Sequence, residues 1–138
     1  AAGRAEAIRE LAGRLLADGR LDDVEGFTRD VLAREAEVST SMGHGIAIPH
    51  AKSAHVRRAG LAFGRSARGI EWPGFDGGVD RVTQLFLIAV PRGADDKHLR
   101  ILAALARSLM DPGFRLRLAG AATAGALAEL LRERLAAT

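Results

Sequence analysis

One uninterrupted apolar segment constrains the fold of this chain more than any other feature. Every residue from Leu85 to Val90 is apolar, and Pro91 follows directly. No apolar run in the sequence is longer, and this one is far shorter than the roughly 18 residues that a membrane-spanning helix needs. Its length is typical of a strand that is buried on both faces. The sequence therefore predicts a central strand over 82–90, in a sheet with helices on both sides, and no insertion into a membrane.

Helical periodicity is found in the sequence both before and after this strand. A second predicted helix can be capped by Asp22 or Asp23 and carries Arg34 near its C-terminal end, where a cation suits the helix dipole. The other predicted helices cover 4–18, about 96–110, 114–118 and 124–135. Further strands are predicted over 46–48, 61–64 and 69–72, with a turn over 74–78. The expected fold class is α/β, with a mixed β-sheet flanked by α-helices on both faces.

Length and cysteine content limit the domain count and the chemistry. The 138 residues predict one domain over 1–138, and 27% charged with 48% apolar residues argue against intrinsic disorder. The chain has no cysteine, which excludes a disulfide scaffold, a thiolate zinc site, an iron–sulfur cluster and a cysteine nucleophile. The chain begins almost directly in helical pattern, without a signal peptide, so a cytoplasmic location is expected.

The charge pattern does not favour nucleic acid as a partner. The net charge is only +3, and the basic residues, nearly all arginines, are spread among acids instead of forming a stripe. Aromatic residues make up 4% of the chain, which leaves little for base stacking. We therefore expect no nucleic-acid partner.

The candidate catalytic residues are the four histidines, His44, His50, His55 and His98. Histidine is the side chain whose ordinary pKa, about 6.5, leaves a neutral nucleophilic nitrogen abundant at physiological pH. The spacing of the first three matches no usual zinc motif, so a three-histidine zinc site is the weaker alternative and no metal is expected. His55 lies in a polar stretch beside two arginines and is predicted to be a solvated surface residue.

Two other kinds of site receive little support. Ser39, Ser41 and Ser53 lie near histidines, but none of them is in a Gly-x-Ser-x-Gly nucleophile motif. The glycines at 43 and 45 form neither a dinucleotide fingerprint nor a P-loop, so no nucleotide cofactor is expected.

The segment 37–50 favours phosphoryl transfer to histidine. His50 follows Pro49 and is expected just past a strand end, beside a loop rich in glycine and hydroxyl groups. Arg34 ends the helix that feeds this loop, and His98 opens a helix whose free N–H groups can bind an anion. An accessible imidazole, a cation and hydrogen-bond donors are what such a transfer requires.

The chain also resembles a known family over nearly its whole length. The matching motifs are Arg34-Glu35-Ala36, Ser39-Thr40, Gly43-x-Gly45-Ile46-Ala47-Ile48-Pro49-His50-Ala51-Lys52-Ser53, Gly69-Ile70-Glu71-Trp72, Asp76-Gly77, Leu87-Ile88-Ala89-Val90-Pro91 and His98-Leu99. They are similar to those of the enzyme IIA domain of the fructose/mannitol type, from the bacterial sugar phosphotransferase system.

The resemblance implies a function and a set of residues. One histidine takes a phosphoryl group from the histidine-containing phosphocarrier protein and passes it to a IIB domain during sugar uptake. His50 matches the phosphorylated histidine, His98 the second active-site histidine and Arg34 the neighbouring arginine, and Thr40 is expected to offer its hydroxyl or N–H to the phosphate. No cofactor is implied, and the sugar is selected by a membrane IIC domain that this chain does not contain.

One departure and two alternatives accompany the resemblance. The family usually reads Gly-Ile-Gly-Asn-Gly where this chain has Ser41-Met42-Gly43-His44-Gly45, so His44 replaces an asparagine in the loop. The first alternative is a regulatory domain of the same fold, from the nitrogen-related branch or a transcription regulator, whose phosphorylation controls a partner. The second is a binding module that is not phosphorylated.

Overall fold

The computed structural model describes residues 3–74, 76–93, 100, 103–104, 107–109 and 111–120, which fall into two compact units, 1–94 and 95–138. The elements of the first unit are α1 (Arg4–Ala17), α2 (Val24–Glu37), β1 (Ser41–Gly43), β2 (Ile46–Ala47), β3 (His50–Ser53), β4 (Gly60–Pro73) and β5 (Val79–Pro91). The prediction that the chain is a single domain stays a prediction.

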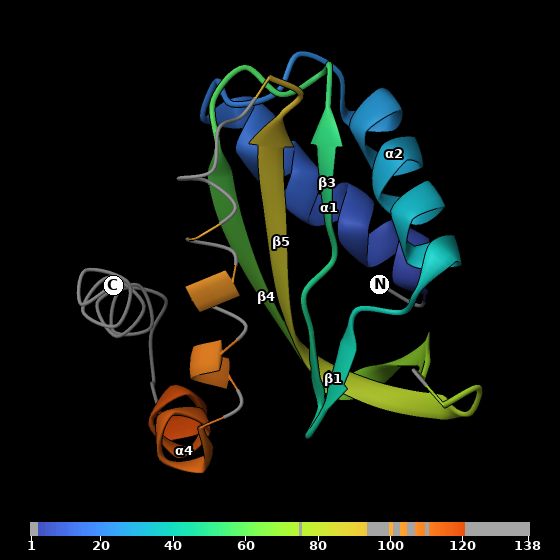
Figure 1. The fold of residues 1–138 in the computed structure, drawn as a ribbon, viewed down its shortest axis with the longest axis vertical. Helices are drawn as coiled ribbons and strands as arrows, with labels where there is room; N and C mark the ends of the chain where they lie inside the picture. Colours follow the sequence, from blue (N-terminus) through green and yellow to red (C-terminus); the bar gives the residue numbers. More distant parts are fainter. Residues whose placement is uncertain are drawn as a thin grey trace. The chain divides into compact units, whose positions relative to one another are not determined.

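β5 is the central strand of a mixed sheet (Figure 1). β4 pairs with it antiparallel, whereas β2 and β3 both pair with it parallel, and β1 pairs antiparallel with β2. Leu85, Phe86, Leu87, Ala89 and Val90 of β5 are buried. The predicted α/β class with a mixed sheet and a buried central strand is confirmed.

β4 joins two segments that the sequence shows as separate strands. Its register on β5 shifts between Arg65 and Ile70, and Gly69 in this irregularity has a φ of 80°. A β-bulge bends a strand without ending it, and glycine is the residue that adopts positive φ without strain. The segment over 69–72 therefore extends the strand predicted over 61–64.

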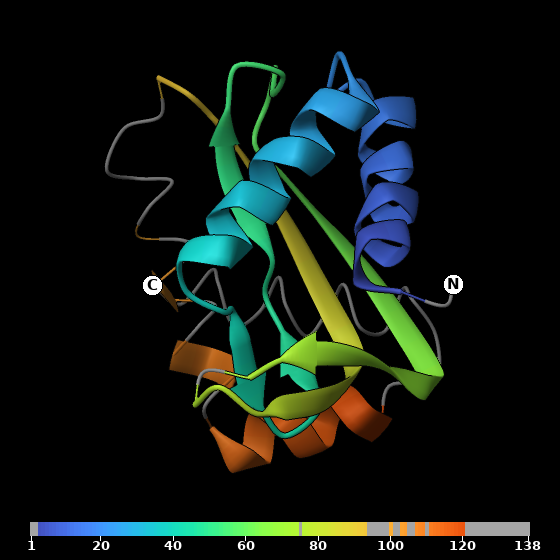
Figure 2. The same cartoon turned by 90° about the vertical axis from the view of Figure 1, so that its right-hand side faces the viewer.

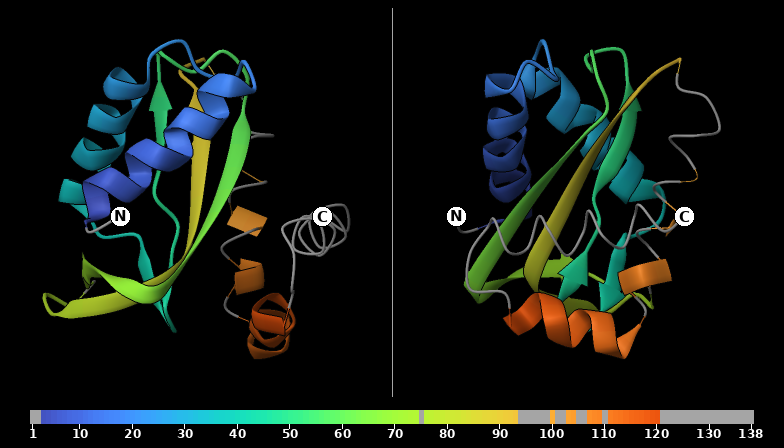
Figure 3. Two further views of the ribbon diagram at one scale, coloured as in Figure 1. Left: turned by 180° about the vertical axis from the view of Figure 1, so that it is seen from behind. Right: turned by 90° about the vertical axis from the view of Figure 1, so that its left-hand side faces the viewer.

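The two helices of the first unit cover one face of the sheet. α1 lies over β4 and α2 over β3, as the views from the side and from behind show (Figures 2 and 3). Ile8, Leu11 and Leu15 of α1 and Phe27 and Val31 of α2 are buried in this interface, as their helical spacing predicts. The side chain of Asp23 accepts from the N–H of Glu25 and so caps α2, which selects between the two predicted caps.

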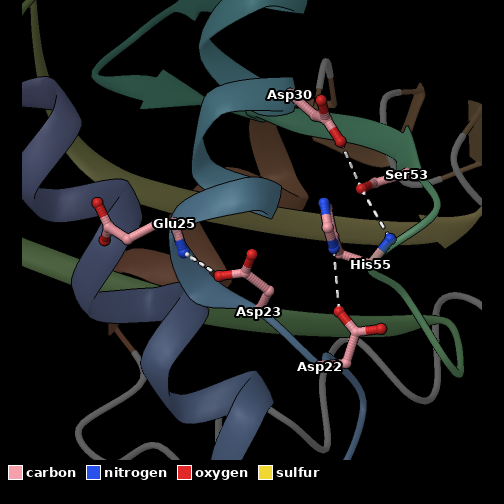
Figure 4. A network of polar contacts seen from close by, with 6 residues as sticks. All are labelled: Asp22, Asp23, Glu25, Asp30, Ser53 and His55. Atoms are coloured by element: carbon pink, nitrogen blue, oxygen red, sulfur yellow. Dashed lines mark hydrogen bonds and ion pairs between the residues drawn. The ribbon is translucent and has the colours of Figure 1, made fainter.

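A polar network joins the α1–α2 connection to the segment after β3 (Figure 4). The His55 ring contacts Asp22 through Nδ1 at 3.0 Å, and the buried Ser53 hydroxyl donates to Asp30 at 2.5 Å. The His55 side chain is 37% exposed, which agrees with the predicted surface position, but its contact with Asp22 was not visible in the sequence, because the pattern did not show that the two connections meet. The network fixes the carboxyl end of β3, the strand that His50 begins.

The second unit is described at fewer positions. Residues 100, 103–104 and 107–109 are helical, as predicted for the segment 96–110. α4 (Pro112–Gly120) begins at a proline, which suits the first position of a helix because its N–H needs no partner there. It contains the short helix predicted over 114–118, whereas the helix predicted over 124–135 lies outside the described residues. Across these described parts of the chain, no helix is long and apolar enough to cross a membrane.

His44 and Gly45 form the two-residue turn between β1 and β2. Gly43 pairs with Ile46 across it, and φ is 57° at His44 and 77° at Gly45. A two-residue hairpin with positive φ at both central residues is the type I′ arrangement, for which Asn-Gly is the preferred sequence. The replacement of the family's asparagine by His44 thus falls at a position that the turn holds at positive φ.

We expect His44→Asn to stabilise the protein by about 0.5 to 1 kcal/mol, since asparagine tolerates the left-handed region better than histidine does. Urea unfolding should show a higher midpoint with an unchanged slope. His44→Val is the matched opposite change and should lower the midpoint. A lower midpoint for the asparagine variant would contradict this account of the turn.

Candidate functional site

His50 is the first residue of β3, at the side of the central strand. The carbonyl of Pro49 accepts from the N–H of Ile88 in β5 at 3.0 Å, and His50 itself pairs with Ile88. The expectation that His50 lies just past a strand end is corrected: β2 stops at Ala47, and His50 begins a new strand. Pro49 has no N–H for a ladder, which explains the interruption between β2 and β3.

The ring of His50 has a defined hydrogen-bond partner. Its Nδ1 lies 2.8 Å from the carbonyl oxygen of Ile48. A carbonyl oxygen only accepts, so Nδ1 carries the proton and Nε2 keeps its lone pair in the neutral ring. In this tautomer Nε2 is the ring nitrogen with a free lone pair, a detail that the sequence could not give.

The surroundings of the half-buried His50 favour this neutral form. Burial lowers the pKa of His50 below its ordinary value of 6.5, and the Arg34 guanidinium lowers it further. The hydrogen bond to Ile48 and the Glu35 carboxylate act in the opposite direction and do not overcome the effect of burial. An uncharged imidazole at neutral pH is the state that can attack phosphorus.

We expect the NMR titration of His50 in the folded protein to have its midpoint below pH 6.5, because burial disfavours the charged ring. The rate of phosphoryl acceptance should rise with pH through this midpoint and then level off, as the neutral ring becomes the dominant form. The resonances of His55 in the same spectra serve as an internal reference when those of His50 are assigned. A midpoint above 6.5 would contradict the burial argument.

Arg34 lies in the last turn of α2. Its Nη1 donates to the carbonyl of Val38 at 2.9 Å, which satisfies one of the unpaired carbonyls beyond the helix end. The predicted dipole-compensating position is thus confirmed. Because its charge also lowers the pKa of His50, the guanidinium lies close enough to act on that ring. One side chain fastens the loop after α2 and places a cation near the His50 ring.

A buried carboxylate beside Arg34 is the main feature that the sequence did not reveal. Glu35 is 4% exposed and accepts from both the N–H and the hydroxyl of Thr40. The indole Nε1 of Trp72 is a third donor to Glu35, at 3.2 Å. Buried carboxylates require such donors, but the contact with Trp72 joins residues 37 positions apart, so no local motif could disclose it.

The two remaining predicted site residues differ in what can be said of them. Thr40 is buried close to the site, but both of its donors bind Glu35, and its contact with a phosphoryl group stays a prediction. His98 lies outside the described residues. The described residues contain no group of three histidine, aspartate or glutamate side chains that could hold a metal ion.

Comparisons with known proteins show which family the chain is similar to. The profile of the family described as "Phosphoenolpyruvate-dependent sugar phosphotransferase system, EIIA 2" matches residues 1–134. The fructose-specific EIIA component of Haloferax volcanii is 40% identical over 116 residues, covering 83% of this chain and 73% of the relative. The fructose-specific EIIABC component of Bacillus subtilis is 36% identical over 126 residues, which are 91% of this chain but only 20% of that longer protein.

Solved structures agree with this result. The nitrogen regulatory protein IIA-Ntr of Neisseria meningitidis superposes with a TM-score of 0.82 at 29% identity, covering 95% of this chain and 88% of the other. The IIA component in the complex of mannitol enzyme IIA with phosphorylated mannitol enzyme IIB, from Escherichia coli, has a TM-score of 0.74 at 25% identity, covering 96% and 90%.

The fold and the site define a class of protein. It is a mixed α/β domain that has a neutral imidazole at its central strands and a cation beside it. Within that class, the chain belongs to the EIIA 2 family of the phosphoenolpyruvate-dependent sugar phosphotransferase system. The resemblance seen in the sequence is confirmed. Membership makes the chain a phosphotransferase component with a phosphoryl-carrier role.

Proposed function

We propose that the chain carries a phosphoryl group on Nε2 of His50 during sugar uptake in the cytoplasm. It accepts the group from the histidine-containing phosphocarrier protein and passes it to a IIB domain. The supporting observation is the pairing of His50 Nδ1 with the Ile48 carbonyl, which leaves Nε2 with a free lone pair.

The transfer balances without a further reagent. The Nε2 lone pair forms a bond to phosphorus while the bond from phosphorus to the donor's histidine nitrogen breaks, and that electron pair stays on the donor. The proton on Nδ1 stays bonded to the Ile48 carbonyl, so the His50 ring takes on the positive charge, while the donor ring, protonated on its other nitrogen, leaves as a neutral imidazole. Arg34 supplies positive charge near the transferred group, whose oxygens carry the negative charge of a loose transition state.

The relatives support the IIB domain as a partner. A structure of mannitol enzyme IIA in complex with phosphorylated enzyme IIB exists for Escherichia coli, and the Bacillus subtilis relative combines EIIA, EIIB and EIIC in one protein. The fructose-specific names of the first two relatives suggest fructose as the sugar to test first.

Incubation with radiolabelled phosphoenolpyruvate, enzyme I and the phosphocarrier protein tests the proposal. We expect the chain to become labelled only when both general proteins are present, and the label to move to a fructose-type IIB domain when that is added. No label under these conditions would overturn the proposal and favour a binding module.

The regulatory alternative remains because the IIA-Ntr structure has a TM-score of 0.82 with this chain. A regulatory domain would accept the label but retain it in the presence of fructose- and mannitol-type IIB domains. Release of the label to either IIB domain therefore separates the two functions.

A further inference from the structure

The buried carboxylate of Glu35 is connected to the ring of His50 by a continuous series of hydrogen bonds. The N–H and hydroxyl of Thr40 donate to Glu35. The carbonyl of Thr40 accepts from the N–H of Ile48 at 3.2 Å. The carbonyl of the same Ile48 accepts from Nδ1 of His50 at 2.8 Å. Each link holds the residue whose carbonyl the next link uses.

The segment from Ile48 to His50 is also held by the central strand β5, independently of Glu35. Pro49, between Ile48 and His50, binds β5 through its carbonyl and the Ile88 N–H. The central strand thus fixes the position of His50 along the strand direction of the sheet. None of the bonds from β5 described above reaches the Ile48 carbonyl itself, and the bond from the Ile48 N–H to Thr40 is a second restraint on the segment that carries this carbonyl.

The donors around Glu35 divide into two groups. Thr40 connects Glu35 to His50. Trp72, which is fully buried in β4, donates to Glu35 through its indole N–H and connects it to the core. A carboxylate strengthens each bond that it accepts, because charge-assisted hydrogen bonds are about twice as strong as neutral ones. The carboxylate can therefore fasten the loop after α2 more firmly than an uncharged side chain would.

We infer that Glu35 is a positioning residue which, through Thr40 and Ile48, holds His50 in the tautomer with the proton on Nδ1 and the lone pair on Nε2. The inference rests on the proposed function for its consequence, since that lone pair is the proposed nucleophile. Free histidine favours the opposite tautomer, with the proton on Nε2, so a loosened loop removes the reactive lone pair. The charged groups to consider around His50 are Arg34 and Glu35 of α2 and Lys52 of its own strand.

The test measures the tautomer without any phosphate. Nitrogen-15 NMR of the imidazole distinguishes a protonated Nδ1 from a protonated Nε2 and also follows the titration of the ring. In the wild-type protein we expect the Nδ1–H form. Glu35→Gln keeps the shape and removes the charge, and we expect a mixture of tautomers, a lower His50 pKa and phosphoryl acceptance slowed by up to about 10²-fold, as for a slightly displaced reacting group.

Three further variants separate positioning from stability. Thr40→Val removes the hydroxyl at constant shape and should shift the tautomer in the same direction, whereas Thr40→Ser keeps the hydroxyl and should behave as wild type. Trp72→Phe removes the core-side donor and should lower the thermal unfolding midpoint while leaving the tautomer unchanged.

Two outcomes would overturn the inference. The first is a wild-type tautomer in Thr40→Val and in any folded Glu35→Gln; if Glu35→Gln does not fold, Thr40→Val decides alone. The second is a shift in Trp72→Phe as large as that in Thr40→Val, which would make the effect one of general stability. A tautomer that shifts as expected in a protein that accepts no phosphate would support the positioning role and overturn only the proposed function.

Discussion

His50→Ala is expected to abolish phosphoryl labelling of the chain, because no other described histidine shares the environment of His50. His44 is exposed in a turn and His55 binds Asp22, whereas His50 combines a lone pair on Nε2 with a nearby arginine. Labelling from phosphoenolpyruvate through the phosphocarrier protein measures the effect, and the acid-labile, base-stable nature of the label identifies phosphohistidine.

His44→Ala and His55→Ala are the matched controls for this experiment. Both should retain full labelling, although His55→Ala should be less stable because it removes the contact with Asp22. Full labelling of His50→Ala would refute the assignment, and loss of labelling in His44→Ala would move the site to the β1–β2 turn.

Arg34→Ala is expected to slow phosphoryl acceptance by about 10² to 10³, the usual cost of losing one electrostatic partner of a transition state. The same change removes a charge that lowers the pKa of His50, so that pKa should rise in the variant. Rapid-quench measurement of acceptance, together with NMR titration of the ring, records both effects.

Arg29→Ala provides the control for Arg34→Ala, since Arg29 is exposed on the same helix. It should leave both the rate and the His50 pKa unchanged. The loss of the Arg34 bond to Val38 should cost about 1 kcal/mol of stability, too little to unfold the domain. A wild-type rate for Arg34→Ala would show that the guanidinium only fastens the end of the helix.

Much of the fold could be predicted because its signals are local. The apolar run from Leu85 to Val90 identified the central strand, apolar spacing identified α1 to within a residue, and the cap at Asp22 or Asp23 identified the start of α2. The break at Pro49 was also visible, but the sequence placed His50 after a strand, whereas it begins one. Whether a chain resumes pairing after a proline depends on the neighbouring strand, here β5, and no local pattern shows that.

The site could be predicted in part for the same reason. His50 and Arg34 lie in recognisable local contexts, a strand interrupted by proline and the last turn of a helix. In the sequence, Glu35 is one more charged residue near a helix end. Only the structure shows the indole of Trp72 and the hydroxyl of Thr40 around its carboxylate. Its importance arises from contacts between segments distant in sequence.

The most direct test of the central claim is NMR of the phosphorylated protein with nitrogen-15 in its histidines. Coupling between phosphorus and a ring nitrogen identifies both the residue and the atom that carries the group. The account predicts coupling to Nε2 of His50, with Nδ1 still protonated and bonded to the Ile48 carbonyl. Coupling to Nδ1 of His50, or to a nitrogen of any other histidine, would contradict it.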